Sequence, residues 1–174
     1  MRVAFGFLLL SAAGATTCDI YELAGTPCVA AHSTVRALFA GYRGALFLVQ
    51  RASDNATAPI NATADGSADS AAQDAFCADT RCTIERIFDR SRSRNHLDTA
   101  PGGGAAGEPD RGVVADRFRS TLAGAAVYGA FFEGGEGYRN DNTTGVAVGD
   151  EPESMYAVFA GKHYNGGCCF DYGT

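Results

Sequence analysis

The sequence predicts an all-β sandwich. Short segments rich in β-branched and aromatic residues alternate with turn residues, and the 174-residue chain contains 22 glycines. We find no internal repeat and no coiled-coil period in it. Short strands joined by glycine-containing turns, with little helix, are typical of sandwich domains.

A secretory signal peptide is expected at residues 1–15. Arg2 precedes an apolar run at residues 3–12, and small residues follow at 13–15, as at a cleavage site. No stretch of the chain reaches the roughly 18 apolar residues that a membrane-spanning helix needs. We therefore expect a secreted mature chain that begins near Thr16 and has no membrane partner.

Four segments carry the strongest strand signals, at residues 45–50, 83–88, 126–132 and 155–159. Each contains β-branched or aromatic residues and is bounded by glycine, aspartate, asparagine or serine.

Two brief helical turns are predicted between these strands. One follows Ser33 and runs through residues 35–39, and the other starts at Ser70, where the sequence Ser-Ala-Ala-Gln has the form of a capping box. Residues 52–69 and 101–112 are predicted to be exposed loops, because they are rich in small, polar and turn-forming residues.

Six cysteines in an exported chain imply disulfides. Although 15 connectivities are possible, local pairing is favoured because tight turns separate neighbouring cysteines. The expected bridges are Cys18–Cys28, Cys77–Cys82 and Cys168–Cys169. Three N-x-[ST] sequons, at Asn55, Asn61 and Asn142, agree with export and predict glycosylation.

The adjacent cysteines Cys168 and Cys169 predict a binding surface. A disulfide between neighbours closes a strained ring, and strain of that kind is often found at ligand sites. Flanking glycines permit close approach, and Asp171 is the nearest carboxylate. The alternatives are that both cysteines bond distant partners or that both are free.

Charge and motif content exclude several functions. The net charge of −6 disfavours nucleic acid and suits a neutral partner such as a polysaccharide. No metal-ligand spacing, nucleotide loop or serine-nucleophile motif is found, so we expect no metal and no cofactor. Carboxylates are plentiful, but no pair has clearly different surroundings, as a glycosidase requires.

The basic turn from Asp89 to Leu97 has two interpretations. It is either a polar loop that binds a sugar, or a strand-ending turn in which Asp89 and Asn95 satisfy backbone groups. The second interpretation is favoured.

Several blocks of the mature sequence resemble a known family. The blocks include residues 18–22, 26–34, 95–97, 137–140, and Cys168-Cys169-Phe-Asp-Tyr-Gly at 168–173. They are similar to the fungal α-L-arabinofuranosidase B family, glycoside hydrolase family 54. Residues 101–126 match it poorly, and the turn at 90–94 is more basic than that of the family.

The resemblance implies a concanavalin-like or lectin-like β-sandwich of jelly-roll type that releases terminal α-L-arabinofuranose, with retention, from arabinoxylan and arabinan. It implies that Cys168 and Cys169 contact the sugar as a vicinal disulfide, and it agrees with the other two bridges. The expected partner is an arabinose-containing plant cell-wall polysaccharide, and the expected state is a monomer.

One difference from the family determines what is expected of this chain. The family's catalytic carboxylates and its arabinose-binding module follow the Cys-Cys block, whereas this sequence ends at Thr174. We therefore expect residues 16–174 to be the N-terminal portion of the catalytic sandwich, with no catalytic residue and an incomplete core. The alternatives are a lectin-like module that binds arabinose without cleaving it, and an unrelated cysteine-stapled secreted protein.

Overall fold

The structure is a computed structural model that describes residues 14–103 and 107–162. Within these residues the elements are α1 (Thr17–Leu23), β1 (Ala45–Arg51), β2 (Thr57–Asn61), α2 (Ser70–Phe76), β3 (Cys82–Ile87), β4 (Leu97–Thr99), β5 (Phe118–Leu122), β6 (Ala125–Gly129) and β7 (Tyr138–Arg139). The expectation of an all-β chain with little helix is confirmed.

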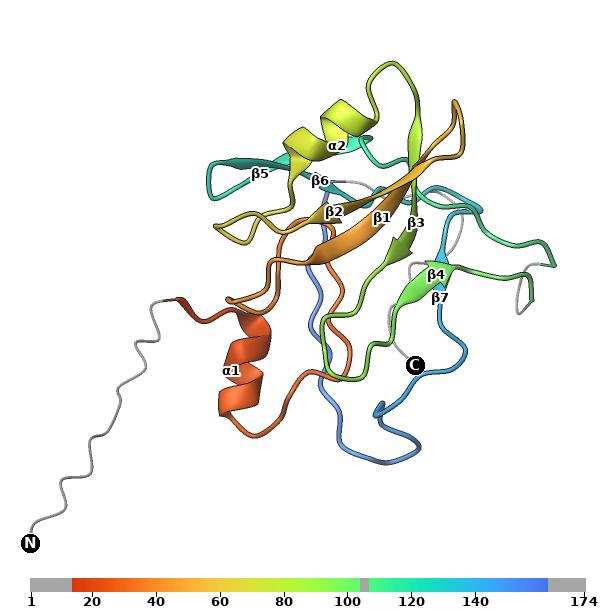
Figure 1. Cartoon of the computed structure of the whole chain (residues 1–174). Coiled ribbons are helices and arrows are strands. Elements are labelled where there is room, and N and C mark those ends of the chain that lie inside the picture. Colours follow the sequence, from red (N-terminus) through yellow and green to blue (C-terminus); the bar gives the residue numbers. More distant parts are fainter. Residues whose placement is uncertain (1–13, 104–106, 163–174) are drawn as a thin grey trace, which may run out of the picture.

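The strands form two antiparallel sheets (Figure 1). The larger has the order β2-β1-β3-β4-β7, and the smaller is the hairpin β5-β6. Helix α2 contacts both β2 and β6, so it links the two sheets at one end. No helix in the described part of the chain is both long and apolar enough to cross a membrane.

The core is centred on β1 and β3. Leu46, Phe47 and Val49 of β1 are at most 1% exposed, and Ile84 of β3 packs with them. The neighbours Leu46 and Phe47 are both buried because a bulge interrupts the pairing of β1 with β2 at this point. The predicted strands at 45–50 and 83–88 are thus confirmed, and the strand predicted at 126–132 is found in part, as β6, which ends at Gly129.

The helical turn predicted after Ser33 is wrong. Residues 33–40 form bends instead, because their backbone groups bond a neighbouring loop. Ala37 donates its N–H to Gly66 at 2.7 Å, and Ala68 donates to Val35 at 2.9 Å. This pairing replaces the bonds that a helix would have made.

The strand predicted at residues 155–159 is also wrong. The structure assigns no strand there, and Figure 1 shows this blue segment without an arrow. Met155, Tyr156, Val158 and Phe159 are 55–79% exposed. The segment carries strand-forming residues but pairs with no strand of the described chain.

The exposed loop predicted at 52–69 contains β2, with Ile60 only 1% exposed. The helix predicted from Ser70 is confirmed as α2. Its N-cap, however, is Asp69, whose side chain accepts the N–H of Ala72. The described parts of the loop at 101–112 contain neither helix nor strand, as predicted.

Two of the predicted bridges are present. Cys18–Cys28 and Cys77–Cys82 have Cα–Cα distances of 5.6 and 5.8 Å. The third predicted pair, Cys168 and Cys169, lies outside the described residues.

Candidate functional site

The predicted substrate-contacting residues Cys168, Cys169 and Asp171 lie outside the described residues. Other groups that could bind or react lie in two surface cavities of the described chain and around one buried carboxylate with a dense set of hydrogen bonds.

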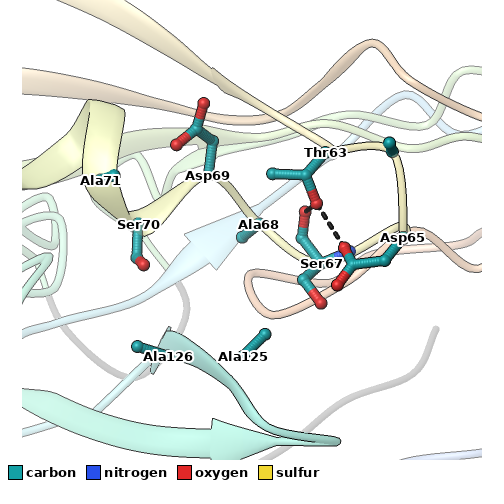
Figure 2. Close-up of a pocket in the computed structure, with 10 residues that line it drawn as sticks. Thr63, Asp65, Ser67, Ala68, Asp69, Ser70, Ala71, Ala125 and Ala126 are labelled. Atoms are coloured by element: carbon teal, nitrogen blue, oxygen red, sulfur yellow. Dashed lines mark hydrogen bonds between the residues drawn. The ribbon is translucent and has the colours of Figure 1, made fainter.

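The first cavity, of about 400 Å³, lies between the loop before α2 and the start of β6 (Figure 2). Its two carboxylates already have local partners. Asp65 accepts bonds from the hydroxyl of Thr63 and the N–H of Ser67, and the first of these holds the pKa of Asp65 below its usual value. Asp69 caps α2. Because the rest of the wall consists of small side chains, we assign this cavity a structural role.

The turn after β3 is organised by Asp89, which is 3% exposed. Its Oδ1 accepts the N–H of Ala31 at 2.7 Å and that of Ser91 at 2.8 Å. Its Oδ2 accepts the N–H of Asn95 at 2.7 Å and the hydroxyl of Ser91 at 2.6 Å. Burial by itself raises the pKa of Asp89, but the bonds from Ser91, Asn95 and Ala31 outweigh it and lower this pKa.

Asn95 extends this set of bonds to a second loop. Its Oδ1 accepts the N–H of Thr144 at 2.8 Å, and its Nδ2 donates to the carbonyls of Val29 and Thr144, both at 2.9 Å. Asp89 and Asn95 therefore satisfy backbone groups, as the favoured interpretation of the turn expects, and these bonds leave Arg94 and His96 of the same turn unaccounted for.

Arg90 turns inward from the same segment. Its guanidinium carbon lies 4.8 Å from the ring centre of Tyr42 and 5.2 Å from that of Phe88. Burial lowers the pKa of Arg90. Its Nε and Nη2 are buried and make no hydrogen bond within the structure, so stacking on the two rings and the nearby charge of Asp89 support this cation.

The second cavity, of about 450 Å³, lies where β4 and β7 end, and we call it the β4–β7 cleft. Its walls are polar. Arg86 makes a two-pronged ion pair with Asp98, and Arg139 bonds Asp141 at 2.6 Å. The lining residues are Arg86, Arg94, His96, Asp98, Thr99, Pro101, Arg139, Asn140, Asp141 and Asn142.

His96 presents a fixed donor in this cleft. Its Nδ1 accepts the N–H of Asp89 at 3.0 Å, which places the ring proton on Nε2. Partial burial, together with the charge of Arg86, lowers the pKa of His96. The ring is therefore neutral at neutral pH, and its Nε2–H remains available as a donor.

Arg94 supplies a charge that the cleft does not neutralise. Asp98 and Asp141 each pair with another arginine, and no carboxylate of the described chain forms an ion pair with Arg94. Its backbone has φ of 55°, the left-handed region that costs a non-glycine residue about 1 kcal/mol or more.

The sequence did not reveal the β4–β7 cleft. The basic turn at 90–94 was noticed, but its partner wall at 139–142 lies 45 residues further along the chain. The pairing of β4 with β7, together with the bond from Asn140 to the carbonyl of His96, brings the two walls together. The three sequon asparagines, Asn55, Asn61 and Asn142, are all exposed. Within the described residues no cluster of histidine, cysteine, aspartate or glutamate could hold a metal ion.

Comparison with known proteins identifies the family. The profile of the catalytic domain of α-L-arabinofuranosidase B matches residues 17–174, almost the whole chain. This chain belongs to the α-L-arabinofuranosidase B catalytic family. The resemblance seen in the sequence blocks is thus confirmed.

Relatives in this family are about half identical to the chain. A probable α-L-arabinofuranosidase B of Aspergillus niger is 52% identical in an alignment 179 positions long, which covers 99% of this chain and 35% of the relative. An α-L-arabinofuranosidase of Hypocrea jecorina is 52% identical in an alignment 170 positions long, which covers 94% of this chain and 34% of the relative. The chain spans about a third of the length of these family members.

Solved structures of the family share the fold. An arabinofuranosidase in complex with arabinofuranosyl-α-1,2-xylobiose superposes with a TM-score of 0.74 at 49% identity, covering 78% of this chain and 29% of that one. A family 54 enzyme soaked with a cyclic sulfate inhibitor gives the same values. The predicted β-sandwich class is therefore confirmed, with antiparallel sheets as expected.

Proposed function

We propose that this chain is the N-terminal third of a secreted α-L-arabinofuranosidase that removes arabinofuranose from plant cell-wall polysaccharide. The observation that carries the proposal is the match of residues 17–174 to the family's catalytic profile, at 52% identity to relatives about three times as long. The residues alone form part of a catalytic sandwich and do not hydrolyse the substrate.

The carboxylates of the buried turn and of the two cavities support the second part of this proposal. A retaining glycosidase needs two carboxyl groups about 5–5.5 Å apart across the sugar bond. Both oxygens of the buried Asp89 carboxylate already accept hydrogen bonds from neighbouring groups. In the first cavity, Asp65 accepts a bond from its own loop and Asp69 accepts one from the first turn of α2. In the β4–β7 cleft both carboxylates are paired with arginine. None of these groups is placed to act as nucleophile or acid.

The segment at 148–159 supports the proposal that further chain completes the sandwich. Val148, Met155, Tyr156 and Val158 are 55–79% exposed, which is unusual for a stretch with strand-forming residues. An exposed, unpaired segment of this kind is the place where another strand would add. We propose that the sequence corresponding to the remaining two-thirds of the relatives supplies that strand.

We also propose that the protein is exported and glycosylated, and that it acts as a monomer. The apolar run at residues 3–12 would direct export, and the exposed positions of Asn55, Asn61 and Asn142 are compatible with attached glycans. Cys168, Cys169 and Asp171 are proposed to contact the arabinose.

The test compares two purified proteins. One is the mature chain, residues 16–174, and the other is the same chain fused to the downstream two-thirds of the Aspergillus niger relative. We expect the fusion to release arabinose from arabinoxylan and the shorter chain to release none. Release by the shorter chain would show that it carries its own catalytic pair.

The intact mass of the natural secreted protein, measured after enzymatic deglycosylation, tests the same proposal independently. A mass far above that of residues 16–174 agrees with it. A mass that matches residues 16–174 removes the enzyme proposal, and the lectin-like module then becomes the leading function. In that case arabinose should raise the melting temperature of the chain.

A further inference from the structure

The β4–β7 cleft has the composition of a site for an acidic sugar, and it is separate from the residues proposed above to contact arabinose. Its volume of about 450 Å³ lies within the range of about 300–1,000 Å³ found for small-molecule pockets. Its walls combine guanidinium, imidazole and amide donors with two carboxylate acceptors.

We propose that this cleft binds a uronic acid, a sugar ring that carries a carboxylate. Arg94 is the group that recognises the carboxylate, because its charge is not neutralised by any described carboxylate of the protein. A guanidinium forms short, charge-assisted hydrogen bonds with carboxylate oxygens.

His96 adds a second donor for the same anion. The bond from the N–H of Asp89 to its Nδ1 fixes the proton on Nε2, so the ring can donate without being charged. Asn140 lines the facing wall, where it is held by a bond from its Nδ2 to the carbonyl of His96 at 2.9 Å. The donors are therefore positioned before a ligand arrives.

The ion pairs of the walls match the hydroxyls of a sugar. Arg86 with Asp98 and Arg139 with Asp141 each offer N–H donors and carboxylate acceptors side by side. A sugar hydroxyl both donates and accepts, so it can bond to both members of such a pair. The choice of a sugar rests on the proposed function, whereas the choice of a carboxylate rests on the cleft itself.

The test measures the binding of D-glucuronate, D-glucose and acetate to the mature chain by titration calorimetry at low salt. The protein is made in a bacterial periplasm, so that the disulfides form and no glycan is attached to Asn142 on the cleft wall. The same titrations are repeated on the fusion with the downstream part of the relative, whose folding is read from arabinose release.

Arg94→Gln is the informative variant, because it removes the charge and keeps a β-carbon in the same backbone conformation. Arg92→Gln is its matched control. Arg92 lies in the same turn with a side chain 93% exposed, bonds Glu22, and does not line the cleft.

We expect glucuronate to bind at least tenfold more tightly than glucose or acetate, and added salt to weaken it. Arg94→Gln should lower its affinity by about tenfold or more, and Arg92→Gln should leave it within about twofold. Equal binding of glucuronate and glucose, or equal effects of the two variants, would overturn the proposal. If acetate bound as tightly as glucuronate, the assignment of a sugar ligand would be wrong. Arabinose release by the fusion tests the proposed function separately, so the two failures can be told apart.

Discussion

Replacing Asp89 by asparagine should destabilise the fold strongly although it changes only one atom. Oδ1 of Asp89 accepts two backbone N–H groups, and Oδ2 accepts a third together with a hydroxyl. An asparagine presents an NH₂ group at one of these two positions. In either orientation at least one buried backbone N–H then faces a donor instead of an acceptor.

The magnitude follows from these contacts. An unsatisfied buried N–H costs about 1–3 kcal/mol, and the bonds that remain lose the assistance of the negative charge. We expect Asp89→Asn to lower the free energy of unfolding by about 2–4 kcal/mol at pH 7. This is a large share of the roughly 5–15 kcal/mol that stabilises a typical domain.

The loss should depend on pH. Because the folded protein holds the pKa of Asp89 below its unfolded value near 3.9, the ionised carboxylate stabilises the fold fully above that pH. This stabilisation disappears as the pH falls through the lower, folded pKa. The difference between the native chain and Asp89→Asn should therefore shrink in strong acid.

Denaturant unfolding at pH 7 and in acid measures the difference, and hydrogen exchange locates it. Exchange should accelerate at the amides of Ala31, Ser91 and Asn95, which bond Asp89. Asp54→Asn is the control, because Asp54 pairs with Arg51 at the surface, where such pairs contribute about 0–1 kcal/mol. Equal unfolding midpoints for the two variants at pH 7 would refute the reasoning.

Two further predictions concern the disulfide and the exposed segment. Replacing both Cys77 and Cys82 by serine should lower the unfolding free energy by about 2 kcal/mol, since the bridge closes a loop with a sequence separation of only 5. If calorimetry instead showed no folded state, the bridge would have a larger role than restricting the unfolded chain. In a mixture with the separately made downstream part of the Aspergillus niger relative, the mature chain should form a complex on gel filtration. The double change Met155→Asp and Val158→Asp should prevent it, whereas Leu23→Asp, at another exposed apolar residue, should not.

The larger sheet could be predicted where local signals and burial agree. Residues 45–51 and 82–87 became strands because their β-branched and aromatic side chains fill the core. The segment 155–159 has the same composition but no partner strand in the described chain, and composition by itself does not supply one.

The helices show the limits of local signals. At the start of α1, the N–H and the hydroxyl of Thr16 both donate to the carboxylate of Asp19, and this Thr-x-x-Asp pattern is a local signal for a helix start. The bends at 33–40 could not be foreseen, since they depend on backbone bonds to residues 66–68. The cleft could not be foreseen for the same reason, because its walls meet through contacts between segments about 45 residues apart in the chain.

Asp89 supports both the stability of the fold and the geometry of the cleft. Asp89 orients His96 through its own N–H and holds the backbone of Asn95, which lies next to Arg94. Asn95 in turn bonds both backbone groups of Thr144, just beyond the facing wall at 139–142. Asp89→Asn should therefore weaken both folding and uronate binding, whereas Arg94→Gln should weaken binding alone. That difference separates a group that positions the cleft from a group that contacts its ligand.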